Sequence, residues 1–218
     1  MDSFKKFLNL QREDNLKRSN YFPSMITKLV KYPFPGIYNV LKKDNFKWSK
    51  KDIVNNLSMF YTYPDIRMSQ SCPSKGEYKN FKYFSFAEHG YDSEISICLR
   101  SDVKAKDIMA EWKSMSEKDW KDLSKNKFFK EFTIVLFHEY THEMQTRRGT
   151  KNPYVIEGAE NVKDGYGIYL SEFRELQAFA IESAFTKRVF GHYSPSIKIY
   201  RHYPVLWKFF KSEMEKWL

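Results

Sequence analysis

Cysteine is scarce in this sequence, and segments that would target or anchor the chain are missing. The 218 residues include two cysteines, Cys72 and Cys98, which lie far apart and outside any CxxC pair. They indicate no disulfide framework, and they fit a reducing compartment. The charged start, Met1 to Lys6, lacks the apolar run of a secretory signal, and no window of about 18 apolar residues could span a membrane. We therefore expect a soluble cytoplasmic protein with no membrane partner.

Internal repeats, low-complexity tracts and dense basic tracts are also missing, although the net charge is +10. Aromatic residues make up 18% of the chain and apolar residues 42%, which excludes extended disorder and predicts a core rich in Phe and Tyr. The length suits one domain. The positive charge favours an acidic partner such as nucleic acid, or it serves solubility alone.

Helical spacing dominates the chain, with a short strand-like region in the middle. Helices are predicted over 3–19, from Ser49 onwards, over 102–123 in two pieces, and over 127–148, 171–189 and 204–218. Strands are predicted over 81–87 and 94–100, and loops over 61–80 and 149–170. The expected fold is α+β, mostly helical with a small antiparallel sheet. It forms a single domain, 1–218, with an N-terminal helical portion (1–75) and a core (76–218).

The longest predicted helix contains an HExxH motif, His138-Glu139-Tyr140-Thr141-His142. Histidines four residues apart are separated by only about 40° around a helix, so both imidazoles can reach one cation. Glu139 lies at the edge of the same face, where it can contact a water on that cation. Chance would produce this motif in such a composition roughly 0.01 times, so the motif predicts a metal site with Glu139 as general base.

A third ligand is expected from the helix predicted over 171–189. Catalytic zinc takes three protein ligands and keeps one position for water, and no further histidine closely follows His142. Glu175 is our first choice, because the small Ala178 one turn later would let the two helices approach closely. The remaining candidates are Glu172, Glu182, His192 and His202. Mixed His and Glu ligation suits zinc best among divalent ions.

His138 to His142, followed 33 residues later by Glu175-Leu176-Gln177-Ala178, resembles the gluzincin pattern HExxH…ExxA. The segment 127–190 also resembles small HExxH proteins often encoded by bacteriophages. The resemblance implies a zincin-like fold with an active-site helix and a glutamate helix, and a zinc metallopeptidase, in the host cytoplasm if phage-encoded. It also implies an edge strand that pairs with an extended peptide or protein substrate, for which 94–100 is the candidate.

Other residues are candidates for supporting roles in such a peptidase. Glu143 and Gln145 lie near the histidines and could orient them. Donors that could stabilise the oxyanion are Tyr166, Tyr169, His192, Tyr193 and His202. The alternative hypothesis is a nucleic-acid-associated protein, either a protease acting on DNA-bound proteins or a binder with a structural metal. A partner-binding protein with a decayed site is a third hypothesis.

Overall fold

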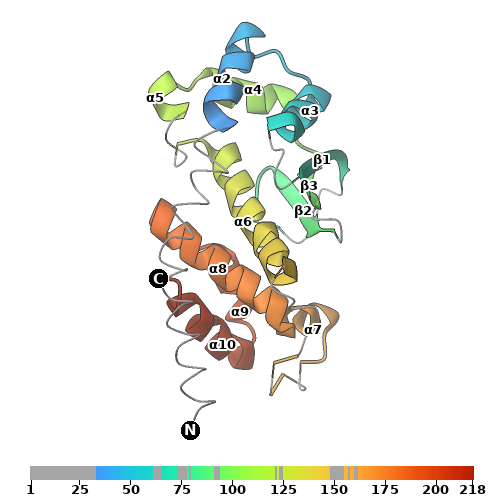
Figure 1. Ribbon diagram of the computed structural model, residues 1–218, viewed down its shortest axis with the longest axis vertical. Coiled ribbons are helices and arrows are strands. Elements are labelled where there is room, and N and C mark those ends of the chain that lie inside the picture. Colours follow the sequence, from blue (N-terminus) through green and yellow to red (C-terminus); the bar gives the residue numbers. More distant parts are fainter. Residues whose placement is uncertain are drawn as a thin grey trace.

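Helix α6 (Lys127–Arg147) runs through the middle of the molecule in the computed structural model (Figure 1). The structure describes residues 33–60, 65–72, 78, 80–90, 94–120, 122, 125–147, 155–156, 158–159 and 162–218. The predicted α+β, mostly helical fold is confirmed, whereas the helix predicted over 3–19 lies outside the described residues. None of the described helices combines the length and apolar character that a membrane span requires.

Short helices form one end of the molecule: α2 (Pro33–Lys43), α3 (Lys50–Phe60), α4 (Ala105–Lys113) and α5 (Glu117–Trp120). Helix α3 begins where predicted, because the Ser49 hydroxyl donates to the Asp52 carboxylate at 2.6 Å and accepts from the Asp52 N–H at 3.2 Å. Ser116 and Asp119 form the same reciprocal cap on α5. The prediction of two helical pieces within 102–123 is therefore confirmed.

Three strands of the described chain form a sheet in the order β1 (Asp65–Cys72), β3 (Glu94–Arg100), β2 (Phe84–His89). Strands β2 and β3 are antiparallel but β1 and β3 are parallel, so the prediction of a wholly antiparallel sheet is wrong in part. Strand β3 confirms the segment predicted over 94–100, and its Ile95, Ile97 and Leu99 are buried. It is the central strand, however, so the prediction that it is the substrate-pairing edge is wrong.

Strand β1 occupies part of the stretch 61–80 that was predicted to be a loop, and this prediction is wrong for residues 65–72. Ile66 and Met68 are buried, whereas Arg67 and Ser69 are exposed. Two alternating apolar residues among polar ones are too few to give a strand signal. Because β1 pairs with β3, hydrogen bonds join the N-terminal portion (1–75) to the core (76–218).

A disulfide joins Cys72 at the end of β1 to Cys98 in β3. We expected no disulfide because the two cysteines lie far apart in the sequence, and this expectation is wrong. Parallel pairing of β1 and β3 brings the two Cα atoms to 5.6 Å, which is a separation that a disulfide can bridge. The bond closes a loop of the chain with a sequence separation of 26 residues.

Reducing this disulfide is expected to lower the free energy of unfolding by about 3 kcal/mol, because a closed loop of this length restricts the unfolded chain. Denaturant unfolding of the oxidised protein, with and without reductant, measures the difference. The Cys72→Ala/Cys98→Ala variant serves as the control, and reductant should not change its stability. Two thiols that react freely in the folded, oxidised protein would contradict the bond.

Helix α6 is buried along most of its length, and every residue from 131 to 143 is buried. Its polar side chains therefore need partners inside the protein. The Glu131 carboxylate accepts hydrogen bonds from the backbone N–H groups of Lys82 and Tyr83, both at 2.9 Å. These bonds attach the segment just before β2 to α6 and so help to place the sheet beside this helix.

The other end of the molecule contains α7 (Gly165–Ser171), α8 (Phe173–Phe190), α9 (Ser196–Tyr200) and α10 (Pro204–Glu215). Helix α8 packs against both α6 and α10, and it ends at Gly191, whose φ of 77° favours glycine. Helix α7 lies within the stretch predicted to be a loop, so that prediction is wrong from Gly165 onwards. The amphipathic α10 is confirmed, since Leu206 and Phe210 are buried, although the Val205 and Phe209 assigned to the same apolar stripe are exposed.

Candidate metal centre

His138 and His142 point toward the same place from successive turns of α6. Their Nε2 atoms lie 3.2 Å apart, and both side chains are buried, with His138 only 1% exposed. The four-residue spacing thus places the two imidazoles as the sequence predicted. Two buried nitrogens at this separation can bind one cation together.

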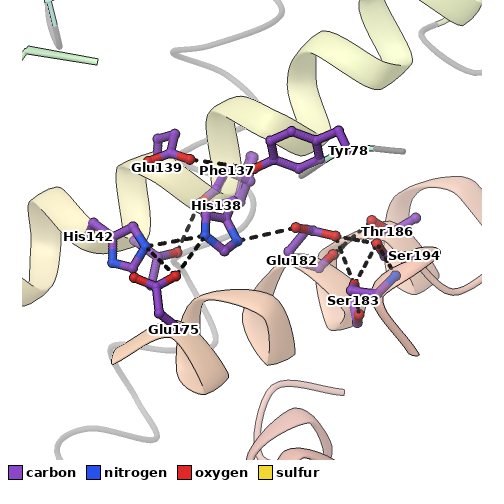
Figure 2. A network of polar contacts seen from close by, with 12 residues as sticks. Tyr78, Phe137, His138, Glu139, His142, Glu175, Glu182, Ser183, Thr186 and Ser194 are labelled. Atoms are coloured by element: carbon purple, nitrogen blue, oxygen red, sulfur yellow. Dashed lines mark hydrogen bonds and ion pairs between the residues drawn. The ribbon is translucent and has the colours of Figure 1, made fainter. Parts of the chain in front are cut away.

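Glu175 approaches this pair from the first turn of α8 (Figure 2). Its Oε2 atom lies 3.3 Å from His142 Nε2 and 3.6 Å from His138 Nε2. A zinc ion about 2.0–2.1 Å from tetrahedral ligands sets those ligands about 3.3–3.4 Å apart. The three donor atoms therefore have the separations that one tetrahedral ion requires. Among the described residues they form the group that could hold a metal.

Close packing of α8 on α6 brings the carboxylate into reach. Ala178, one turn after Glu175, is fully buried, as expected for a small residue where two helices meet. The rings of Phe137 and Phe185 stack between the helices, and the Phe179 ring lies 4.2 Å from the His138 ring, centroid to centroid. These ring contacts hold α8, which carries Glu175, against α6, which carries the two histidines.

The other candidates for the third ligand lie outside the triangle formed by His138 Nε2, His142 Nε2 and Glu175 Oε2. Glu172 precedes α8 and is partly exposed, and His192 and His202 are exposed. Glu182 is buried, but its Oε2 lies 3.3 Å from Nδ1 of His138, on the side of the ring away from the triangle. Our first choice, Glu175, is therefore the carboxylate that the structure places with both histidines.

Residues around the ligands fix the orientation of the second histidine. Gln145 Oε1 lies 2.9 Å from His142 Nδ1, as expected from the sequence, and the Gln145 amide donates to Gln177 at 3.0 Å. Glu143 pairs with His89 Nε2 at 2.7 Å. His89 had no signal in the sequence, and its contact ties β2 to the HExxH turn of α6.

Glu139 lies beside His138 on α6 and is 2% exposed. The Tyr78 hydroxyl donates to Glu139 Oε1 at 3.4 Å (Figure 2). The Tyr78 ring stands perpendicular to the His138 ring, and its backbone N–H donates to the Ser85 carbonyl of β2 at 3.2 Å. Tyr78 could not be found from the sequence, because it lies 61 residues before Glu139 in a stretch without helical or strand periodicity.

Of the predicted oxyanion donors, Tyr169 contacts the cluster formed by His138, His142 and Glu175. Its hydroxyl donates to Glu175 Oε2 at 2.5 Å, the same oxygen that faces the two histidines. Tyr166 stacks on the Tyr169 ring with a centroid separation of 6.2 Å. The remaining candidates are exposed: His192, Tyr193 and His202.

The electrostatics of the cluster favour the charged forms of Glu175 and His138 even without a cation. Burial opposes ionisation of Glu175, but hydrogen bonds with His138 and His142 outweigh it and lower the pKa of this carboxyl. Burial likewise acts to lower the pKa of His138, yet Glu175 and Glu182 raise it well above its ordinary value. Burial raises the pKa of Glu139, which the nearby histidines only partly offset. A partly buried carboxylate beside two buried imidazoles is a site where a cation can replace protons.

Comparisons of the chain with protein-family models, curated proteins and solved structures found no match. The resemblance to gluzincins therefore stays a prediction. What the cluster can do is inferred from its donor atoms and their surroundings.

Proposed function

We propose that this chain is a zinc-dependent peptidase in which His138, His142 and Glu175 hold the ion and Glu139 is the general base. The observation that carries the proposal is the triangle of two imidazole nitrogens and one carboxylate oxygen, with sides of 3.2, 3.3 and 3.6 Å, beside a buried glutamate. Nitrogen and oxygen donors at such separations suit zinc. When bound, zinc would lower the pKa of a coordinated water and polarise a peptide carbonyl.

Glu139 supplies the proton transfers in this proposal. It accepts the proton of the attacking water and passes it to the leaving amine. The Tyr78 hydroxyl donates to Oε1 of this carboxylate, so we assign the proton transfer to the other oxygen, Oε2. The raised pKa of Glu139, caused by burial, makes the carboxylate a stronger base than a solvated one. Tyr169, already beside Glu175, is the donor best placed to stabilise the oxyanion.

Strand β2 replaces β3 as the strand that we propose to bind substrate. It is an edge strand of the described sheet and packs against α6. Edge strands bind extended peptides through main-chain hydrogen bonds. The contact between His89 and Glu143 fixes the end of β2 relative to His142. A peptide paired with β2 would therefore lie at a set distance from the metal ligands.

The alternative of a nucleic-acid-associated protein depends on the net charge of +10. A set of three ligands beside a buried glutamate favours hydrolysis over a structural metal, because structural zinc sites usually take four protein ligands. Nucleic-acid binding is compatible with the peptidase, but no contact in the described residues points to it.

The purified protein is expected to contain about one zinc ion per chain and to cleave an unfolded protein such as casein. Chelation should abolish cleavage, and zinc should restore it, since the ion supplies the activated water. Elemental analysis and a fluorescent casein assay measure the two properties. Cleavage by the metal-free chain would overturn the proposal, as would the absence of stoichiometric metal. A zinc-loaded chain that cleaves neither casein nor a broad peptide library would favour the structural-metal alternative.

A further inference from the structure

The structure assigns a positioning role to Glu182, a buried carboxylate that the proposed reaction does not use. We infer that hydrogen bonds from Ser194 and Ser196 hold Glu182 in place. Glu182 then favours the tautomer of His138 that carries its proton on Nδ1 and leaves Nε2 free to bind the metal. This inference rests on the proposed metal site. It concerns how the chain prepares one ligand, and it does not depend on which substrate is cleaved.

The contacts of Glu182 divide between its two oxygens (Figure 2). Oε1 accepts hydrogen bonds from the hydroxyls of Ser194 and Ser196, the latter at 3.0 Å. Oε2 takes no hydrogen bond from these serines and lies 3.3 Å from His138 Nδ1. Because both serines donate to Oε1, the other oxygen is turned toward the imidazole.

Burial makes this arrangement informative. Glu182 and His138 are each 1% exposed. Oε2 of Glu182 and Nδ1 of His138 are buried without a hydrogen bond of good geometry, although they face each other at an ion-pair distance. Buried polar atoms normally have hydrogen-bond partners. A small rotation of either side chain would let these two atoms form a hydrogen bond with each other. That bond would form when His138 carries its ring proton on Nδ1.

The position of the ring proton decides whether His138 can bind a metal. A neutral imidazole carries one proton, and a metal can bind only the nitrogen that lacks it. An acceptor at Nδ1 holds the proton there and presents the lone pair of Nε2 to the site. Nε2 is also the atom that lies 3.6 Å from Glu175 and 3.2 Å from His142 Nε2. Glu182 therefore acts through His138 and does not contact the metal.

The Glu182→Gln variant separates this role from a structural one. The serines would hold the amide oxygen, so the amide N–H₂ would face Nδ1. An imidazole with its proton on Nε2 can accept that N–H, which keeps the metal-free fold intact but blocks the metal-binding nitrogen. We expect zinc to bind about 10–100-fold more weakly, whereas the melting temperature of the metal-free protein stays equal or rises, because a buried charge is removed.

Glu131→Gln is the matched control, since Glu131 is also a buried carboxylate of α6. It lies on an earlier turn and accepts hydrogen bonds from the backbone N–H groups of Lys82 and Tyr83, just before β2. This variant should lower the melting temperature of the metal-free protein and leave zinc affinity within twofold. Competition with a fluorescent chelator measures affinity, and calorimetry of the metal-free protein measures melting. The Ser194→Ala/Ser196→Ala variant, which removes the serine hydrogen bonds to Glu182, should weaken zinc binding at least threefold.

Wild-type zinc affinity in Glu182→Gln would overturn the inference and leave the proposed peptidase standing. A metal-free Glu182→Gln protein that melts as early as Glu131→Gln, or does not fold, would also overturn it, because Glu182 would then be structural. A wild-type chain that binds no zinc in the same titration would instead refute the metal site itself.

Discussion

Replacing Glu139 with glutamine is expected to lower kcat by about 10³-fold while one zinc ion stays bound. Glutamine has nearly the same shape, so the packing around this buried side chain is kept, but it cannot accept a proton. General base catalysis contributes about 10²–10⁴-fold in enzymes. The hydroxyl of Tyr78 can still donate to the amide oxygen, so the variant should fold as the wild type does.

The measurement is the rate of casein cleavage at saturating substrate, together with zinc content and melting temperature of the same preparation. Glu172→Gln is a suitable control, since Glu172 is a partly exposed carboxylate next to α8 and outside the triangle. It should keep the wild-type rate. If Glu139→Gln, with its zinc retained, cleaves casein at the wild-type rate, Glu139 is not the general base.

The grouping of the proposed metal ligands could be anticipated from the sequence because the histidine spacing is a property of a single helix. His138 and His142 share one face of α6 whatever surrounds them. Glu175 required a further step, namely that a second helix packs against the first, and α8 does pack against α6. Local periodicity was thus enough to group residues that lie on one helix or on two helices in close contact.

Contacts between distant segments could not be predicted in the same way. Tyr78 meets Glu139, and His89 meets Glu143, only because β2 packs against α6. Neither residue has neighbours in sequence that indicate a role. The parallel strand β1 was missed for a related reason, because an edge strand with few apolar residues has little periodicity. The order β1-β3-β2, and with it the choice of edge strand, depends on long-range pairing.

Removal of the Glu175 carboxylate is expected to have the largest effect on the metal itself. Zinc sites of four ligands bind with about 10–16 kcal/mol in total, so an equal share for one ligand is about 3 kcal/mol, or roughly 100-fold in affinity. Glu175→Ala should therefore weaken zinc binding about 100-fold or more. His142→Ala, which removes the donor 3.3 Å from the same carboxylate oxygen, should have a similar effect.

Chelator competition distinguishes this ligand set from the others that the sequence allowed. Glu172→Ala and His202→Ala should bind zinc as the wild type does, because both residues lie outside the triangle. Equal affinity in Glu175→Ala and Glu172→Ala would show that neither is a ligand. A loss confined to Glu172→Ala would instead require α8 to begin differently, with its first turn rotated toward His142. The donor separations of 3.2–3.6 Å argue against that rotation, since they already match one tetrahedral ion without any movement of α8.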